Sequence, residues 1–490
     1  MGAFLALDQG TTSSRALVFD GDSYRVTGVA QHEFRQHFPR PGWVEHDAEE
    51  ILATQWRAAQ EAHRAAGEPQ ITAVGITNQR ETVVVFDRRS GKPIHHALVW
   101  QDRRTAAALA ELASNGRAAR VKELTGLPMD PYFSAAKIAW ILDAVPGARQ
   151  AAARGELAAT TVDGWLIHRL TDGAVLATEP SNASRTSLYD LSQGDWSDEL
   201  LELFRVPRAC LPEIRPSAGP FGNVAATGWP ICGVLGDQQA ALFGQGCLQP
   251  GAAKCTYGTG AFLLQNCGTA RPNVEQGVLG TVAWRLGDRD TFATEGSVLV
   301  CGALVQWLRD GLGIIDNAAA LEPLARSVPD TGGVVVVPAF AGLGTPHWDP
   351  QARGLIIGLT RGTTRAHLAR AALEAMAYSV REVQLAVAAA SGHPLPELRV
   401  DGGAVANDLL LQLQAAISGI PVRRPAQLES TALGACRIAM LGCGGAATPE
   451  QLPPTGTHAD NFPPEAGVVD AEAGWRQWRE AVDRSRGWAP

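Results

Sequence analysis

Short apolar runs of strand length alternate along most of the chain with segments whose apolar residues recur at helical spacing. Each strand-like run ends at a polar residue or at a glycine turn. This alternation is typical of an α/β architecture. The pattern predicts strands at Phe4–Leu7, Ala16–Phe19, Thr72–Ile76 and Val83–Phe86, and helices at Ala48–Ala66, Arg365–Ala389 and Thr431–Leu441.

Two segments repeat one local pattern, a strand, a turn rich in glycine and hydroxyl groups, and a second strand. Phe4–Asp20 has the turn Gly-Thr-Thr, and Lys254–Gln265 has the turn Gly-Thr-Gly. Two such hairpins, one opening each half, predict a duplicated fold. Pro216–Pro230 is rich in Gly, Pro and Ala, and we interpret it as the join between the halves.

Charge and composition exclude several classes of protein. The formal charge is −8 over 490 residues, with no block of Lys or Arg that would indicate a nucleic-acid or anionic membrane surface. No apolar run reaches membrane-spanning length, and the first residues carry no signal-peptide pattern. The eight cysteines have no CxxC spacing and are interpreted as buried, reduced thiols. These features predict a cytoplasmic protein that binds neither nucleic acid nor membrane.

The first hairpin tip has the composition of a phosphate loop. Asp8–Arg15 combines a glycine, four consecutive hydroxyl side chains and an arginine, all of which can approach phosphate oxygens. Asp8 at the end of the first strand adds a possible ligand for a metal ion. The alternative is an ordinary hairpin turn whose hydroxyl groups satisfy local backbone groups. None of the four lysines lies in a Walker A motif, so any ATP site has another architecture.

Two later segments resemble parts of a nucleotide site. Thr256–Gly260 is the tip of the second hairpin, and facing the first tip it would form a phosphate clamp. Val400–Asn407 runs from a strand through Asp-Gly-Gly toward a helix, which places backbone N–H groups at a helix N-terminus. A tight turn that needs glycine for its geometry is the alternative.

Asp237 is the strongest candidate for a general base. It follows the strand Ile231–Leu235 and stands where a helix is expected to begin. A carboxylate in that position is held ionised, as a base for an alcohol must be. It can also be a simple N-cap, and the sequence leaves both interpretations open.

Charged and aromatic groups elsewhere suggest a polyol site. Arg80 and Glu81 lie between two apolar strands, where they could bind adjacent hydroxyl groups or form a hairpin-tip ion pair of little energetic value. Trp100–Arg104 and Asp130–Ser134 place aromatic rings beside polar groups, as sites for sugar carbons do, although core packing explains them equally.

Taken in order, these segments resemble the FGGY carbohydrate kinases, from Ala6 to about Gly442, and specifically the branch of that family that acts on glycerol. The resemblance is carried by DQGTTSSR (Asp8–Arg15), GWVEHD (Gly42–Asp47), TNQRET (Thr77–Thr82), WQDRRT (Trp100–Thr105), DPYFSA (Asp130–Ala135), NASRT (Asn182–Thr186), GDQQAAL (Gly236–Leu242), YGTG (Tyr257–Gly260), EGSV (Glu295–Val298), QWLRDGLG (Gln306–Gly313), WDPQARG (Trp348–Gly354), GLTRGT (Gly358–Thr363) and DGGAVAN (Asp401–Asn407).

The resemblance implies a fold of two duplicated α/β domains of the actin, Hsp70 and sugar-kinase superfamily (ribonuclease H-like) around a central cleft. The implied domains are 1–246, which holds the polyol side, and 247–490, which holds the adenosine site. The implied reaction is phosphorylation of glycerol by Mg-ATP, which yields ADP and sn-glycerol 3-phosphate. A homo-oligomer, dimer or tetramer, is also expected.

The resemblance also assigns a role to individual residues. Asp237 would be the base and would lie at the metal ion with Asp8. The glycerol pocket would consist of Arg80, Glu81, Trp100, Tyr132, Asp237, Gln238 and Phe262. The ATP site would consist of Thr11, Thr12, Ser13, Arg15, Thr259, Gly302, Gln306, Gly403 and Asn407.

Other functions remain as alternatives. The nearest is a sibling kinase for another polyol, such as erythritol or dihydroxyacetone. A nucleotide-driven switch of the Hsp70 or actin type is a second, but such a protein has no use for the Arg80, Glu81 and Asp237 set. A dehydrogenase is weaker still, because Val400–Asn407 does not match the dinucleotide fingerprint GxGxxG.

Overall fold

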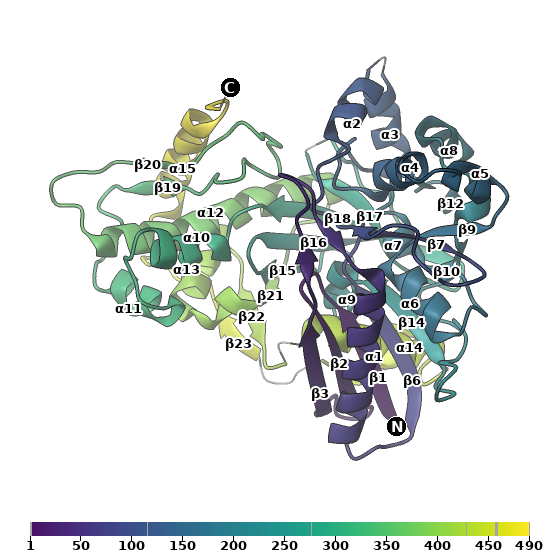
Figure 1. The fold of residues 1–490 in the computed structure, drawn as a ribbon. Coiled ribbons are helices and arrows are strands. Elements are labelled where there is room, and N and C mark those ends of the chain that lie inside the picture. Colours follow the sequence, from purple (N-terminus) through teal and green to yellow (C-terminus); the bar gives the residue numbers. More distant parts are fainter. Residues whose placement is uncertain (1, 115, 276, 428, 456–458, 490) are drawn as a thin grey trace.

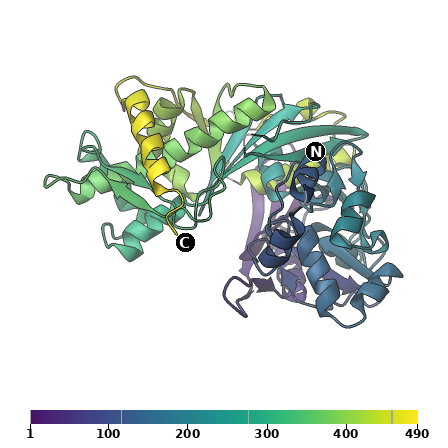
Figure 2. The ribbon, with the colours of Figure 1, turned by 90° about the horizontal axis from the view of Figure 1, so that it is seen from above.

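The computed structural model describes residues 2–114, 116–275, 277–427, 429–455 and 459–489. The first half of the chain forms one lobe and most of the second half forms another, as Figures 1 and 2 show from two directions. The first lobe contains a five-stranded sheet in the order β14-β6-β1-β2-β3. Its strands are β1 (Ala3–Gln9), β2 (Ser13–Asp20), β3 (Val26–Glu33), β6 (Ile71–Asn78) and β14 (Ile231–Gly236).

Both faces of the strands β1, β6 and β14 are largely buried, which explains why these strands are apolar runs rather than alternating patterns. The edge strand β3 instead contains exposed residues. Leu5 and Leu7 of β1 pack in a cluster with helix α1 (Ala48–Ala65). Phe4 and Ala6, which point to the opposite face, pack with α14 (Ser430–Gly442). Helix α14 comes from the second half of the chain, so the first sheet is covered in part by the C-terminal region (Figure 1).

The second lobe is built on a seven-stranded sheet in the order β17-β18-β16-β15-β21-β22-β23. Helix α12 (Arg365–Ser391), which the sequence pattern predicted, is mostly buried and packs against this sheet. The strands are β15 (Ala253–Tyr257), β16 (Ala261–Gly268), β17 (Leu279–Leu286), β18 (Arg289–Val298), β21 (Leu398–Asp401), β22 (Val422–Pro425) and β23 (Ala459–Phe462).

The two large sheets repeat one topology. In the first sheet, β1 and β2 form an antiparallel hairpin, β6 is parallel to β1, and β14 is parallel to β6. In the second sheet, β15 and β16 form the hairpin, β21 is parallel to β15, and β22 is parallel to β21. An antiparallel third strand, β3 or β18, continues each sheet beyond its hairpin. The repeated order confirms the predicted duplication.

The predicted join between the halves is wrong. Pro216–Pro230 leads into β14, which still pairs with β6 in the first sheet. The chain passes to the second sheet only after α9 (Asp237–Gly244), between that helix and β15. Glycine and proline mark a loop in either case, and composition does not distinguish a loop within a lobe from one between lobes.

A third sheet and a group of helices complete the first lobe. The sheet has the order β4-β5-β8-β7-β9, and Figure 1 shows the helices gathered beyond it. These strands are β4 (Gln36–His37), β5 (Glu45–His46), β7 (Val83–Asp87), β8 (Ala97–Leu98) and β9 (Leu157–Thr161), and the helices are α2 (Ala106–Leu112), α3 (Arg117–Thr125), α4 (Ser134–Ala144), α5 (Ala148–Ala153), α6 (Val162–Leu170), α7 (Pro180–Ala183) and α8 (Asp198–Phe204).

The remaining elements are short or lie at the edges of the lobes. Strands pair two by two as β10 (Ala177–Thr178) with β13 (Glu213–Ile214), β11 (Tyr189–Asp190) with β12 (Asp195–Trp196), and β19 (Val335–Val337) with β20 (Leu355–Ile357). The other α-helices are α10 (Gly302–Gln306), α11 (Leu321–Arg326), α13 (Asp408–Ser418) and α15 (Ala471–Ser485). Among the described residues, no helix is long and apolar enough to cross a membrane.

The cysteines follow the prediction except at one position. All eight are free thiols, and seven of them are buried. Cys443, which follows α14, is exposed. The interpretation of small buried thiols therefore holds for the lobes and is wrong for Cys443.

We expect His46 to make the stability of the fold sensitive to acid. Its ring is fully buried, Nε2 lies 2.6 Å from Gln36 Oε1, and Nδ1 has no partner among the described residues. Burial lowers the pKa of His46 to about 3, and the neighbouring His37 contributes to the shift. Below pH 6.5 the unfolded chain binds a proton that the native ring does not, so native stability falls as the pH falls toward 3.

This contribution is measured by urea unfolding at pH 7.5 and pH 5.0. Between pH 7.5 and pH 5.0, the contribution of His46 should lower the free energy of unfolding by about 2 kcal/mol. His46→Gln should lack that part of the decline, whereas His96→Gln, at an exposed ring, should retain it. An equal decline in wild type and His46→Gln would mean that the buried ring takes up its proton within the fold.

Candidate functional site

Arg80 and Glu81 are buried where the chain passes from one sheet to another. They follow β6 of the first sheet and precede β7 of the third, so they do not occupy a hairpin tip. Only 3% of Arg80 and 1% of Glu81 is exposed. Glu81 has a φ of 61°, an uncommon conformation for a residue with a side chain. The alternative of a hairpin-tip ion pair of little energetic value is therefore wrong.

Both residues belong to a network of buried charges that joins the two lobes. The Arg80 guanidinium donates to both carboxylate oxygens of Glu295 on β18, at 2.6 and 3.2 Å. Arg185, which follows α7, donates to Glu81 Oε1 at 2.6 Å and to Glu295 Oε1 at 3.1 Å. Burial alone would raise the pKa of Glu295, but Arg185 and Arg80 lower it to about 2. Glu295 is therefore a carboxylate in the folded protein.

Asp237 lies at the edge of this network. It is the first residue of α9, and the N-cap is Gly236, so the interpretation of Asp237 as N-cap is wrong. Its Oδ1 is 3.1 Å from Arg80 Nε and accepts the Gln238 N–H at 2.7 Å. About a third of the Asp237 side chain, 32%, is exposed. The ionic contact to Arg80 fixes one carboxylate oxygen and leaves Oδ2 without a hydrogen bond among the described residues.

Aromatic side chains line the region beside the charged network. The rings of Trp100 and Tyr132 meet edge to face with centroids 5.5 Å apart, and the Arg185 guanidinium lies over the Tyr132 ring at 5.7 Å. Burial raises the pKa of Tyr132. The buried Lys137 ammonium donates to the carbonyls of residues 131–133 and thereby fixes the loop that carries Tyr132. Trp100 Nε1 donates to Thr11 Oγ1 at 3.0 Å, which connects this wall to the first hairpin tip.

The first hairpin carries Asp8 and Arg15 opposite each other in register. Arg15 Nη2 is 2.5 Å from Glu429 Oε2, and Arg15 Nη1 is 4.0 Å from Asp8 Oδ2. Burial raises the pKa of Asp8 to about 6, Arg15 opposes the rise, and the nearby Asp237 adds to it. Asp8 and Asp237 thus lie within electrostatic range of each other. Thr11 and Thr12 lie in the tip itself, and Ser13 is the first residue of β2.

The described residues contain no group of three or more His, Cys, Asp or Glu side chains that could hold a metal ion. Asp8 and Asp237 offer two carboxylates at most. Such a pair suits Mg²⁺, which keeps several waters and is usually bound by one or two carboxylates together with substrate phosphates. The donor set therefore fits Mg²⁺ that arrives with a nucleotide.

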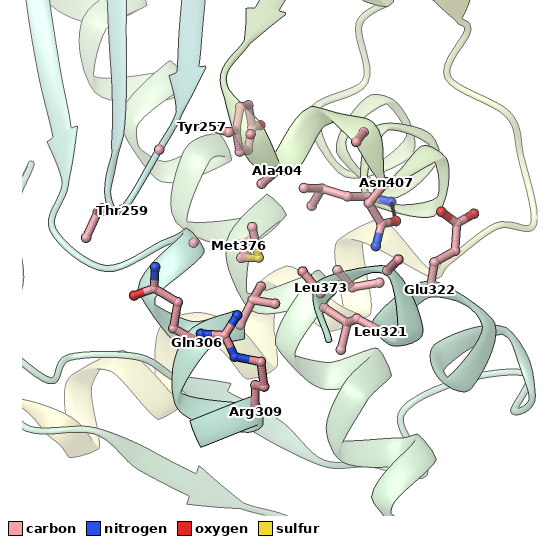
Figure 3. Close-up of a pocket in the computed structure, with 18 residues that line it drawn as sticks. Tyr257, Thr259, Gln306, Arg309, Leu321, Glu322, Leu373, Met376, Ala404 and Asn407 are labelled. Atoms are coloured by element: carbon pink, nitrogen blue, oxygen red, sulfur yellow. Dashed lines mark hydrogen bonds between the residues drawn. The ribbon is translucent and has the colours of Figure 1, made fainter. Parts of the chain in front are cut away.

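The second hairpin tip opens into a cavity of about 590 Å³ in the second lobe. Its lining includes Gly302, Gln306, Gly403 and Asn407, which the family resemblance places around the adenosine, and Thr259, which it places at the phosphates. Figure 3 shows Gln306 and Arg309 projecting from one side of the cavity and Asn407 lying on the other. Apolar side chains, among them Leu321, Leu373, Met376 and Leu410, complete the lining.

Backbone contacts fix the shape of this cavity. The N–H of Gly302, at the start of α10, donates to Gly258 O at 2.9 Å, which holds the helix against the hairpin tip. A Cβ at Gly302 would lie 2.5 Å from the same oxygen, so the approach requires glycine. Asn407 caps α13 by accepting the Leu410 N–H at 2.9 Å. The predicted transition from strand to helix is therefore present, with a 3₁₀ turn at Gly403–Ala406 between them.

The predicted site residues fall into separate groups in the structure. Arg80, Glu81, Tyr132 and Asp237 lie in or beside one charged network, and the five cavity residues line one cavity. Phe262 lies on β16 in register with Thr256 and Ser297. Glu295, Arg185, Arg309 and Met376 were not predicted as site residues. EGSV, NASRT and QWLRDGLG are segments of the family resemblance and contain Glu295, Arg185 and Arg309, but nothing in the sequence pattern indicates Met376.

Comparisons with known proteins agree on one family. Residues 3–244 match the FGGY family of carbohydrate kinases, N-terminal domain, and residues 253–443 match its C-terminal domain. A glycerol kinase of Trichlorobacter lovleyi is 54% identical over 100% of both chains. A glycerol kinase of Bordetella parapertussis is 53% identical and covers 99% of this chain and 97% of its own.

Solved structures give the same result. The structure of Plasmodium falciparum glycerol kinase with ADP superposes with a TM-score of 0.92 at 31% identity, and covers 99% of this chain and 98% of that chain. A xylulose-type kinase of Brucella ovis follows with a TM-score of 0.85 at 25% identity, and covers 99% of this chain and 98% of its own.

Proposed function

The chain belongs to the FGGY family of carbohydrate kinases, and we propose that it uses Asp237 to transfer the γ-phosphoryl group of ATP to glycerol. The activity is ATP-dependent phosphorylation of glycerol to sn-glycerol 3-phosphate. The observation that carries it is identity of 53–54% over nearly the full length of glycerol kinases. The buried Arg80 and Glu81, together with the partly exposed Asp237, supply the polar groups that such a substrate requires.

Glycerol would bind between the charged network and the aromatic wall. Arg80 and Glu81 offer a donor beside an acceptor for adjacent hydroxyl groups, and Gln238 adds a carboxamide. Trp100, Tyr132 and Phe262 would pack against the carbon chain. Because the ion pairs of Arg80 and Glu81 already exist in the protein, these groups are positioned before the substrate arrives.

Asp237 would accept the proton of the glycerol 3-hydroxyl as that oxygen attacks the γ-phosphorus in line. Arg80 and the Gln238 N–H occupy Oδ1, so Oδ2 is the oxygen for the substrate proton. Phosphoryl transfer depends mainly on position and charge, and a base near the attacking hydroxyl completes it.

ATP would bind with its adenosine in the 590 Å³ cavity and its phosphates between the two hairpin tips. Thr11, Thr12, Ser13 and Arg15 would contact the phosphates from the first tip, and Thr259 would do so from the second. Mg²⁺ would be held by Asp8, Asp237 and the phosphates, and when bound it would neutralise phosphate charge. Gly302, Gln306, Gly403 and Asn407 would surround the adenosine.

We expect a bulky side chain at Gly403 to block ATP specifically. A Cβ there meets no atom within 4 Å, so the fold can accept a substitution, and the added side chain can extend into the cavity. Gly403→Trp should raise the KM for ATP at least about tenfold, the effect of losing about 1.4 kcal/mol of binding, and leave the KM for glycerol unchanged. Steady-state kinetics with each substrate varied in turn measures both constants.

The matched control is Gly362→Trp, because Gly362 is exposed, has a negative φ and also has room for a Cβ. It should leave both constants near wild type. If Gly403→Trp changes neither constant, the nucleotide does not occupy this cavity.

The function itself is tested by ADP release from Mg-ATP with glycerol, dihydroxyacetone, erythritol, xylulose or no acceptor. Release with glycerol far above the rate without acceptor, and a product identified as glycerol 3-phosphate, is the expected result. Preference for another acceptor would change the assigned substrate and leave the proposed mechanism in place. Equal release with and without acceptor would favour a nucleotide-driven switch.

The remaining assignments are proposals about the whole protein. We place the boundary between the domains at residues 246 and 247, within the connection from α9 to β15. Free thiols without disulfides suit a reducing cytoplasm. The homo-oligomer that the family resemblance implies would be measured by sedimentation velocity.

A further inference from the structure

Lys254 is a fully buried lysine at the boundary between the two lobes. It lies on β15, where successive side chains point to opposite faces of the sheet. Cys255 and Tyr257 point into the core of the second lobe. Lys254 and Thr256 therefore point to the other face, toward the first lobe and α9.

The strand register shows what shares that face with Lys254. One row across the sheet contains Glu295, Leu264, Lys254 and Arg399. The next row contains Ser297, Phe262, Thr256 and Asp401. The face thus carries the carboxylate that binds Arg80 and the aromatic ring proposed for the substrate. Lys254 therefore shares a face of the sheet with residues of the proposed glycerol pocket. One strand, β16, lies between its own strand, β15, and the strand of Glu295, β18.

The contacts of Lys254 are unusual for a buried cation. Its Nζ donates to Gln238 Oε1 and, at 2.9 Å, to Thr256 Oγ1. Among the described residues it makes no ion pair with a carboxylate, although a buried charge is normally paired. A buried, unpaired ammonium is costly for stability, and its position beside a proposed substrate residue points to a role in the site.

The chemistry of the ammonium determines the orientation of Gln238. A lysine ammonium has three donors and no acceptor, so the Gln238 atom that faces it must be the carbonyl oxygen. The amide Nε2 then points away from Lys254, and it has no hydrogen bond among the described residues. Gln238 follows Asp237, the proposed base, directly on α9.

The charges around Lys254 are consistent with a place inside the site. Burial lowers the pKa of Lys254, and the carboxylates of Asp401 and Asp237 oppose that shift. Lys254 is therefore within electrostatic range of Asp237. Thr256 Oγ1 and Gln238 Oε1 take two of its three donors and hold the ammonium in place.

We propose that Lys254 is a positioning residue that holds the Gln238 carboxamide with its NH₂ group toward the substrate, so that Gln238 acts as a hydrogen-bond donor to a glycerol hydroxyl. This proposal rests on the proposed glycerol kinase function. Without Lys254, the carboxamide can rotate and present its oxygen to the same hydroxyl. In the intact protein, the side chain of Lys254 would thus act on specificity through Gln238 and not on the reacting atoms.

The test is Lys254→Met, which keeps the apolar stem and removes the ammonium. The KM for glycerol should rise at least about tenfold, the scale expected when one well-oriented hydrogen bond to the substrate is lost, whereas the KM for ATP and kcat should stay within about threefold. A purely structural role would instead change all three parameters or the yield of folded protein. Lys92→Met, at an exposed lysine, is the control and should match wild type.

A double-mutant cycle shows whether Lys254 acts through Gln238. If it does, Lys254→Met with Gln238→Ala should have the same glycerol KM as Gln238→Ala alone. Additive effects on the glycerol KM would overturn the proposal. A Lys254→Met variant whose main defect is in the KM for ATP or in kcat would also overturn it, because such a defect would place the ammonium at the phosphates.

A second variant keeps the proposal testable if Lys254→Met does not fold. Gln238→Glu retains an oxygen for Lys254 and replaces the donor NH₂ by an acceptor. Its glycerol KM should rise at least about tenfold, by the loss of the same hydrogen bond, and an unchanged KM would contradict the proposed orientation. Wild type is assayed in parallel, so that a missing glycerol-dependent rate counts against the proposed function and not against the role of Lys254.

Discussion

Asp237→Asn should bind glycerol about as well as wild type and lower kcat by at least roughly 10²-fold, the scale of lost general-base catalysis. Asparagine has the shape of aspartate, and its amide oxygen can still accept the Gln238 N–H and lie near Arg80. It cannot accept a proton from the attacking hydroxyl. The loss should therefore appear in kcat, with little change in the KM for either substrate.

The measurement is steady-state ADP release with glycerol, combined with calorimetric titration of glycerol into the variant. Asp198→Asn is a matched control, because Asp198 is also the first residue of a helix, α8, and lies at the surface far from the network. It should have wild-type kinetics. Near-normal turnover of Asp237→Asn would falsify the assignment of the base, and loss of glycerol binding would make Asp237 a binding residue first.

The sequence pattern predicted the elements that repeat in the fold. Both hairpins, helix α1 and helix α12 were expected within a few residues of their observed bounds, because the length of an apolar run and the turn residues beside it distinguish a buried strand from a long helix. The reason why the central strands are apolar on both faces cannot be read from the local sequence pattern. Helix α14 returns from the C-terminal region to cover the first sheet, and no local pattern identifies its partner.

The site was predictable where its residues are contiguous and not where they meet through tertiary packing. Gly302, Gln306, Gly403 and Asn407 line one cavity although about 100 residues separate the two pairs, and only the family resemblance placed them together. For Arg80 and Glu81 a hairpin-tip ion pair of little energetic value was the alternative, because the burial of these two side chains cannot be inferred from the local sequence.

The role of Glu295 was still less predictable from the sequence. It is part of a β-strand, where an acidic residue is usually solvent-facing, and its two arginine partners are 110 and 215 residues away. Its role as the common acceptor for Arg80 and Arg185 follows only from the packing of the two lobes. The same packing makes Lys254 and Gln238 neighbours, so the contacts between the lobes determine much of the proposed substrate pocket.

Because Glu295 neutralises two buried arginines, Glu295→Leu should be strongly destabilising. Removing one partner of a buried ion pair leaves an uncompensated charge and typically costs about 3–5 kcal/mol. Arg185 would retain Glu81, and Arg80 would retain Asp237, but both would lose their contact with β18. Urea unfolding at pH 7.5 should show this loss in the free energy of unfolding.

A matched control separates burial from the ion pair itself. Glu199 also accepts from an arginine with both oxygens, at 2.8 Å each to Arg120, but this pair is at the surface. Glu199→Leu should cost less than about 1 kcal/mol, as exposed ion pairs generally do. Equal costs for the two variants would mean that the network contributes no more than a surface pair.

The pH dependence gives an independent test of the same network. Arg185 and Arg80 hold the pKa of Glu295 at about 2, against the effect of burial and below its ordinary value of 4.5. A depressed pKa contributes stability that is present above pH 4.5 and is lost as the pH falls through 2. The difference in unfolding free energy between wild type and Glu295→Leu should therefore be constant from pH 7.5 to about 4.5 and shrink below that. A difference that already shrinks between pH 7.5 and 5 would mean that Glu295 holds a proton in the folded protein, and the two arginines would then need another counter-charge.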